Sequence, residues 1–288
     1  MVSEGAGVPA DADGGAVSAD ALALGATDGE DAAGTDGWHA AARTASSASN
    51  PAPCRIGSKA IQPATRRGSA TRSSACQTRT MREEALRIDD RLEATLRIPD
   101  ETPRGMVVVA HPLPTHGGTM RNPLVAALAR AVAGRGLYAL RFNFRGVGAS
   151  AGEWTGGVEE WRDIDAAVAQ ARRTAPRLPV GITAFSFGAY QTLTWLAHGG
   201  QADGVALVGV PLRSADLQRQ PLPPVPAGTF IVAAEHDQFG TADELRAALP
   251  QARIAEVKGV DHFFAPKRDE VGALVADELV RALASKVP

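Results

Sequence analysis

The chain has 288 residues, a formal net charge of −2 and two cysteines, Cys54 and Cys76. A near-neutral charge does not favour a polyanionic partner, so we expect no nucleic-acid binding. The sequence has no run of the roughly 18 apolar residues that a bilayer-spanning helix requires, so we also expect no membrane insertion.

The first 80 residues differ in composition from the rest. Residues 1–40 carry eight Asp or Glu and no Lys or Arg, whereas residues 41–80 carry seven Lys or Arg and no acid. Both stretches have few large apolar side chains, so burial cannot offset the entropy of ordering them. We expect residues 1–80 to be a disordered low-complexity tail, with Met81 as an alternative start, and residues 81–288 to form one domain. Both cysteines lie in the tail, and a thiol-free domain is typical of a cytoplasmic enzyme.

Strand-like and helix-like segments alternate from Met81 onward. Residues 84–99 alternate in hydropathy on either side of an "IDD" turn, which predicts an opening hairpin. The predicted elements that follow are strand 105–111, helix 122–136, strand 137–144, helix 158–174, strand 179–185, helix 187–198, strands 204–210 and 228–235, helix 241–250, strand 252–258 and helix 269–286. This alternation predicts an α/β fold, a doubly wound and mostly parallel sheet with helices on both faces. In such sheets reactive groups gather at the carboxyl ends of the strands.

Ser186 follows one of these strands within "AFSFG", residues 184–188. This pentapeptide is one residue away from G-x-S-x-G, the nucleophile elbow, which needs small residues two positions before and after the serine. Gly188 meets that requirement, and Ala184 replaces the first glycine with one additional methyl group. The alternative is a helix N-cap, because a serine before a helix satisfies free backbone N–H groups in any protein.

Asp237 and His262 follow two later strands, so the three residues occur in the order that elbow enzymes use. A serine hydroxyl needs a base to accept its proton, and the base needs a carboxylate that fixes its tautomer. Asp261 adjoins His262 and is a poorer candidate for this carboxylate, since it would have to turn back onto its neighbour's ring. Glu235 lies within the predicted strand and is also less suitable. The sequence therefore predicts the catalytic set Ser186, Asp237 and His262.

An oxyanion hole requires two backbone N–H groups. One would come from Phe187, and the other from the loop "HPLPTHGGTM" after strand 105–111. Pro112 has no N–H, so Leu113 is the better donor. His111 and His116 in this loop are five positions apart with no third ligand nearby in sequence, so we expect no metal. Binding, or hydrogen bonding that shapes the loop, is the preferred role for His111.

The segments "GMVVVAHPLPTHGGTMRNPLV", "RFNFRGVGASAGEW" and "AFSFGAYQTL" resemble the α/β-hydrolase superfamily. They are especially similar to a small bacterial group of predicted hydrolases related to dienelactone hydrolases and serine aminopeptidases. The resemblance covers most of 81–288 and none of 1–80. It implies an eight-stranded, mostly parallel sheet, with Ser186 as nucleophile, Asp237 as acid and His262 as base.

Many members of this superfamily carry a helical cap after the strand that here ends near Val210. This chain has only the Pro-rich segment 211–227 there, so we expect a minimal lid and an open, shallow cleft. The predicted lining is Leu113, Trp154, Phe187, Phe263 and Phe264. Of the residues around the cleft, His111, Trp154 and Phe263 are the candidates for substrate binding.

Two other functions are alternatives to hydrolysis. The pattern Gly146-x-Gly148-x-x-Ala151 follows a strand but does not open directly into a helix, as a dinucleotide fingerprint must, so we expect no cofactor. A non-catalytic α/β-hydrolase scaffold acting as an interaction protein is the stronger alternative, although this chain retains both the serine and the histidine. The sequence favours a serine hydrolase that acts on a small ester-, thioester- or amide-type acyl substrate through an acyl-enzyme.

Overall fold

The computed structural model describes residues 82–213 and 221–286. The tail predicted over residues 1–80 lies outside this part of the chain, as does the centre of the segment 211–227. The strands are β1 (Arg82–Ile88), β2 (Leu92–Ile98), β3 (Met106–Ala110), β4 (Tyr138–Phe142), β5 (Val180–Phe185), β6 (Gly204–Val208), β7 (Phe230–Ala234) and β8 (Arg253–Val257). The helices are α1 (Pro123–Gly134), α2 (Trp161–Thr174), α3 (Phe187–Ala197), α4 (Ala242–Ala248) and α5 (Arg268–Ala284).

The eight strands form one sheet in the order β1-β2-β4-β3-β5-β6-β7-β8. Strands β3 to β8 pair in parallel, while β1 pairs with β2 and β2 with β4 in antiparallel fashion. The mostly parallel sheet and its opening hairpin are therefore confirmed. The central strands β3 and β5 are buried along their whole length, because helices cover both faces of the sheet.

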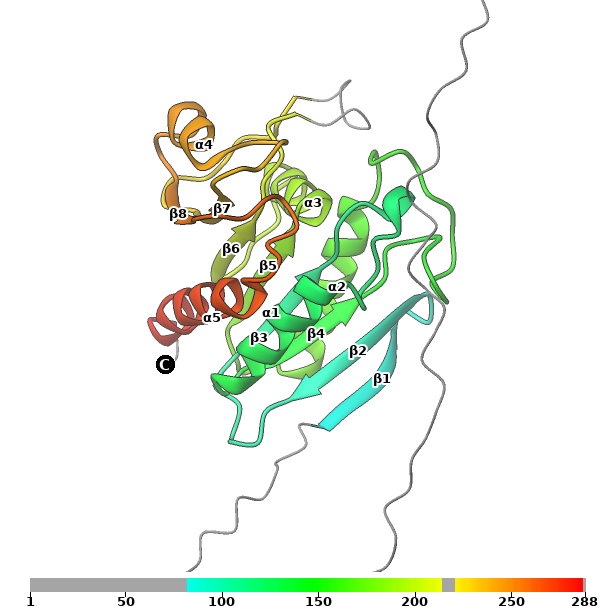
Figure 1. Ribbon diagram of the computed structural model, residues 1–288. Helices are drawn as coiled ribbons and strands as arrows, with labels where there is room; N and C mark the ends of the chain where they lie inside the picture. The colour runs from blue at the N-terminus through cyan, green and yellow to red at the C-terminus, as the bar shows by residue number, and fades with distance from the viewer. Residues whose placement is uncertain (1–81, 214–220, 287–288) are drawn as a thin grey trace, which may run out of the picture. The chain divides into compact units, whose positions relative to one another are not determined.

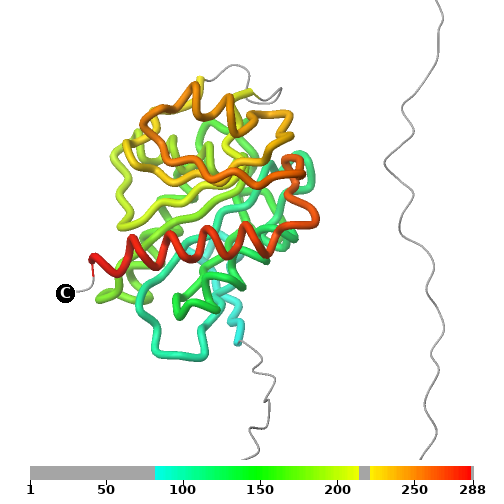
Figure 2. The backbone as a smooth tube through the Cα atoms, turned by 60° about the vertical axis from the view of Figure 1, so that its left-hand side comes forward, coloured from blue at the N-terminus to red at the C-terminus, as the bar shows by residue number. Residues whose placement is uncertain are grey.

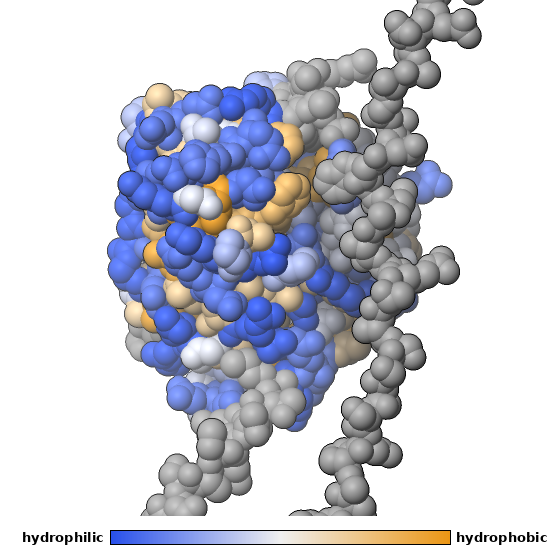
Figure 3. All heavy atoms as spheres, viewed as in Figure 1, coloured by the Kyte–Doolittle hydropathy of each residue, from blue (hydrophilic) through white to orange (hydrophobic). Residues whose placement is uncertain are grey.

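Helices pack on both faces of the sheet. On one face α1 and α5 lie against each other (Figures 1 and 2), and their buried side chains share a core cluster with the sheet, including Leu128 and Leu279. On the other face α2, α3 and α4 contribute to a second cluster through residues such as Ile164, Leu193 and Leu245. The face drawn in Figure 3 is mainly hydrophilic, with hydrophobic residues visible near its middle.

Side-chain caps define the starts of α1 and α4. The Asn122 side chain accepts hydrogen bonds from the N–H groups of Leu124 and Val125, and Pro123 is the first residue of α1. Thr241 and Glu244 form a reciprocal capping box at the start of α4. A short 3₁₀ helix, Pro114–His116, lies in the loop after β3 and is an element that the sequence pattern did not predict.

The strand order places the site. The chain runs from β3 outward through β4, crosses back to β5, and continues through β6 to β8 on the other side of β3. In the parallel register Ala110 at the end of β3 pairs with Ala184 near the end of β5. The loops that leave these two strands therefore begin side by side, at the point where an open α/β sheet places its ligands.

Candidate active site

Ser186 occupies a sharp turn between β5 and α3. Its backbone has φ 54° and ψ −114°, a left-handed φ that is uncommon for a residue with a side chain. Two backbone bonds hold it there: its N–H donates to Val208 O over 2.9 Å, and its carbonyl accepts the Tyr190 N–H over 3.0 Å. The Ser186 hydroxyl makes no helix-cap hydrogen bond. The helix-cap alternative for this serine is therefore wrong.

Small residues at positions 184 and 188 allow the turn to pack tightly. A Cβ atom on Gly188 would lie 2.7 Å from the carbonyl oxygen of His111, so α3 begins in direct contact with the backbone after β3. Ala184 is fully buried within β5, and its single methyl group is accommodated. Position 188 therefore excludes any side chain, whereas position 184 accepts a methyl group.

Ser186, His262 and Asp237 lie in one chain of hydrogen bonds. The His262 Nε2 atom is 2.8 Å from Ser186 Oγ, and the His262 Nδ1 atom is 2.8 Å from Asp237 Oδ2. The second carboxylate oxygen of Asp237 accepts the Phe239 N–H over 2.8 Å. His262 and Asp237 are 3% and 1% exposed, so their mutual bond is shielded from water. Ser186 follows β5, Asp237 follows β7 and His262 follows β8.

The competing carboxylate Asp261 points elsewhere. Its Oδ1 atom accepts the N–H of Phe263 over 3.0 Å, and the residue is exposed. Aromatic rings lie around the imidazole of His262: Phe185 has a centroid distance of 5.1 Å, and Phe239 packs edge-on at 4.7 Å. The sequence analysis did not predict Phe239 as a site residue, although its position two residues after Asp237 could have indicated that it lies near His262.

The loop after β3 is organised by His111. The ring is fully buried, and its Nε2 atom accepts the backbone N–H of Phe144 over 3.1 Å. The proton must then reside on Nδ1, which donates to the carbonyl oxygen of Pro112 over 2.7 Å. Burial lowers the pKa of His111 from 6.5 to about 4, against the opposing effect of the Pro112 carbonyl.

The His111 bond fixes the peptide that joins Pro112 to Leu113. In a trans peptide the C=O and N–H groups point in opposite directions. Because His111 holds the Pro112 carbonyl, the Leu113 N–H points away from the ring. The Leu113 carbonyl in turn accepts the N–H groups of His116 and Gly118. Phe187 is the first residue of α3, where an N–H has no acceptor within the helix.

Aromatic side chains continue from this loop to the elbow. Phe144 packs edge-on against His111 and against Phe187, and Trp154 lies 5.1 Å from the Phe187 ring. Phe263 is 51% exposed, whereas its neighbour Phe264 is fully buried against Phe185. The prediction that the side chains of Phe264 and Phe187 line the cleft is therefore wrong, because both rings are buried in the core.

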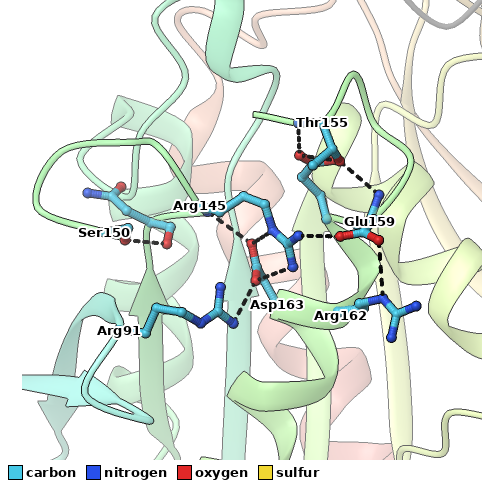
Figure 4. A network of polar contacts seen from close by, with 9 residues as sticks. Arg91, Arg145, Ser150, Thr155, Glu159, Arg162 and Asp163 are labelled. Atoms are coloured by element: carbon cyan, nitrogen blue, oxygen red, sulfur yellow. Dashed lines mark hydrogen bonds and ion pairs between the residues drawn. The ribbon is translucent and has the colours of Figure 1, made fainter. Parts of the chain in front are cut away.

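A network of charges supports the loop that carries Trp154 (Figure 4). Arg145 and Arg91 both bond the fully buried carboxylate of Asp163 on α2, and Arg145 also pairs with Glu159. The buried carboxylate of Glu160 accepts the N–H and the hydroxyl of Thr155. Arg145 at the start of the loop 145–160 and Thr155 within it are thereby attached to residues at the start of α2.

Neither a metal-ligand cluster nor a membrane-spanning helix is present among the described residues. Across 82–213 and 221–286 no three His, Cys, Asp or Glu side chains are grouped as metal ligands. In the same part of the chain no helix has the length and apolar character of a membrane span.

The sheet, the helices on both faces and the elbow define an α/β-hydrolase. The sequence profile of the family described as serine aminopeptidase, S33 matches residues 101–283, and the chain belongs to this family. An uncharacterised protein of Rickettsia prowazekii is 28% identical over 186 residues, which are 61% of this chain and 78% of that protein.

Solved structures agree with this assignment. An α/β serine hydrolase homologue from Coxiella burnetii is 27% identical, with a TM-score of 0.60, over 69% of this chain and 97% of its own. A serine hydrolase from Xanthomonas campestris, described as lacking a lid, is 26% identical, with a TM-score of 0.61, over 70% and 95%. A putative α/β hydrolase from Agrobacterium tumefaciens is 25% identical, with a TM-score of 0.60, over 72% and 98%. The chain is thus a hydrolase by family and by fold.

Proposed function

We propose that this chain is a serine acyl hydrolase with Ser186 as nucleophile, His262 as base and Asp237 as the acid that orients the base. The observation that carries the proposal is the continuous path of two 2.8 Å hydrogen bonds from Ser186 Oγ through the imidazole to Asp237 Oδ2. This arrangement matches the roles of base and orienting carboxylate in serine nucleophile chemistry.

In the proposed reaction Ser186 Oγ attacks a substrate carbonyl carbon while His262 Nε2 takes the hydroxyl proton. The imidazolium that forms is stabilised by Asp237, and it returns the proton to the leaving group as the carbon–heteroatom bond breaks. A water molecule then attacks the acyl-enzyme while His262 takes its proton; the bond between the acyl carbon and Ser186 Oγ breaks, the acid is released, and His262 returns the proton to Ser186 Oγ. No metal or cofactor takes part in these steps.

The amides of Phe187 and Leu113 are the proposed oxyanion hole. Phe187 N–H stands at the start of α3, where the helix dipole favours negative charge. The bond from His111 to Pro112 supports the role of Leu113, because it orients the intervening peptide. A preorganised donor of this kind contributes about 3–4 kcal/mol to transition-state stabilisation.

The proposed substrate is a small ester, thioester or amide. Trp154, which packs on Phe187, and Phe263, which is half exposed beside His262, are the proposed contacts for its apolar part. The predicted substrate contact by His111 is wrong, since its ring is fully buried and both ring nitrogens bond to the backbone; His111 shapes the loop after β3 instead. The lid-free description of the Xanthomonas protein supports an open cleft here, which would accept protruding acyl groups.

A fluorophosphonate probe, which reacts with activated serines, tests the proposal. We expect labelling of the native chain and of a Ser285→Ala control, whose exposed serine is the C-cap residue that follows α5. We expect no labelling of Ser186→Ala. Hydrolysis of p-nitrophenyl acetate and of an aminoacyl p-nitroanilide then separates esterase from aminopeptidase activity. If the native chain neither reacts with the probe nor hydrolyses any of these substrates, the non-catalytic scaffold is the better description.

A further inference from the structure

Gly209 lies directly against the imidazole of His262. It follows β6 with φ +56°, and its N–H donates to Val232 O over 2.9 Å. A Cβ atom at this position would lie 3.2 Å from His262 Cε1, 3.3 Å from His262 Nδ1 and 3.2 Å from Phe185 Cε2. These separations are shorter than ordinary van der Waals contacts of 3.4–4 Å.

We propose that Gly209 is a positioning residue for His262, whose missing side chain sets where the imidazole lies between Ser186 and Asp237. This inference rests on the proposed function. The atoms nearest the absent Cβ are Cε1 and Nδ1, and Nδ1 donates to Asp237. A methyl group on residue 209 would therefore press on the edge of the ring that makes this bond.

The imidazole has little room to move aside. It is 3% exposed, with Phe185 and Phe239 packed against it at 5.1 and 4.7 Å. Phe185 is itself buried and contacts Phe264. A displacement of a few tenths of an ångström would thus change one or both of the 2.8 Å bonds. Since a misplacement of about 1 Å costs about 10²-fold in rate, we expect Gly209→Ala to lower kcat on the order of tenfold, with KM little changed.

The backbone conformation alone offers another explanation, because any L-residue at φ +56° is strained. Gly228 is a matched control: its φ is +79°, and no atom lies within 4 Å of a Cβ built there. Gly228→Ala introduces the same kind of backbone cost without the contact. We expect it to leave kcat unchanged.

The experiment compares native, Gly209→Ala and Gly228→Ala proteins in p-nitrophenyl acetate hydrolysis and in proton NMR of the imidazole N–H groups. The Nδ1 proton of His262 is assigned by its loss in His262→Gln. In Gly209→Ala we expect this resonance to shift or broaden together with the loss of kcat. Both readouts should stay native in Gly228→Ala. A native resonance and native kcat in Gly209→Ala, or an equal loss of kcat in Gly228→Ala, would overturn the inference.

Two further outcomes are distinguishable. If the native chain shows no hydrolysis and no probe labelling, the proposed function fails, while the NMR comparison still decides whether Gly209 positions the imidazole. If Gly209→Ala does not fold, the double variant with Phe185→Leu replaces it, because loss of the Phe185 ring removes one of the two close contacts of the new methyl group and leaves the contact with His262. Its Nδ1 resonance should be displaced from that of Phe185→Leu alone, and an identical resonance contradicts the proposal.

Discussion

The buried His111 ring donates a hydrogen bond from Nδ1 to the carbonyl oxygen of Pro112 and accepts one at Nε2 from the Phe144 N–H. Protonation of Nε2 would place two donors against each other. Burial is the main cause of the low pKa of about 4, compared with 6.5 for the exposed group. His111 therefore links the loop after β3 to the loop after β4 only while its ring is neutral.

A decrease in stability with acidification follows from this pKa. Since the unfolded chain takes up the His111 proton near pH 6.5 and the folded chain only near pH 4, stability is full above pH 6.5 and falls until about pH 4. The decrease is about 3 kcal/mol in unfolding free energy. Urea unfolding of native and His111→Gln proteins across this pH range measures the decrease. All other titratable groups are the same in both proteins, so the difference between them is due to His111. Identical pH dependence in the two proteins would contradict the prediction.

Asp237→Asn should lower kcat by about 10⁴-fold, because an amide neither fixes the His262 tautomer nor stabilises the imidazolium. The overall fold should persist, as the Phe239 N–H can still find an acceptor in the amide oxygen. Ester hydrolysis provides the measurement. Asp261→Asn is the matched control, since that exposed carboxylate bonds only its own turn at Phe263 in the described structure. Equal losses in the two variants would argue against Asp237 as the acid.

The two small positions of the elbow should respond differently to substitution. Ala184→Gly restores the G-x-S-x-G pattern but removes a buried methyl group and adds strand flexibility, so we expect a loss of about 1–2 kcal/mol in stability with activity retained. Gly188→Ala forces a methyl group against the His111 carbonyl, and we expect a marked loss of kcat. Thermal unfolding and kcat of both variants test this contrast. An activity loss in Ala184→Gly greater than in Gly188→Ala would refute it.

Asp163→Asn should be strongly destabilising, because it leaves Arg145 and Arg91 beside a buried neutral group. Loss of one partner of a buried ion pair costs about 3–5 kcal/mol, and the partial exposure of Arg91 favours the lower end. Glu159→Gln, which alters the more exposed arm of the same network, should cost less than about 1 kcal/mol. Chemical denaturation of the two variants gives the comparison, and similar costs would contradict it.

Phe263→Ala should raise KM for esters with apolar acyl groups without loss of stability, since the ring is half exposed beside His262. A surface substitution of this kind changes unfolding free energy by about 0.5 kcal/mol or less. Val158→Ala, at the other large exposed apolar residue of the described structure, is the control and should leave KM unchanged. A series of p-nitrophenyl esters of increasing length provides the test. An unchanged KM throughout would remove Phe263 from the proposed substrate contacts.

The fold could be predicted from the sequence because its signals are local. The buried β-branched run of β3 and the capped helix that follows it each identify themselves within a short window. The sequence also indicated that Ser186, Asp237 and His262 lie close together, since each follows its own strand and the carboxyl ends of parallel strands meet at one edge of the sheet.

Other features depend on contacts between residues far apart in the chain. The pairing of Arg91 with Asp163 spans 72 positions, and nothing in either local sequence indicates it. Which phenylalanine of the pair Phe263 and Phe264 faces outward depends on a turn in which Phe264 adopts φ 54°. The role of Gly209 is likewise invisible in sequence, because it consists of an absent side chain next to a distant ring.

The hairpin of β1 and β2 ends the sheet on the side away from β7 and β8, and three strands separate β1 from β5. Most side chains of β1 are exposed, and it pairs with β2 alone among the strands described. A tether attached at Arg82 would therefore join the molecule at an exposed edge strand of the sheet, which has one described neighbour. If the chain is immobilised on a bead through that edge, the carboxyl ends of β5, β7 and β8 should remain accessible to solvent.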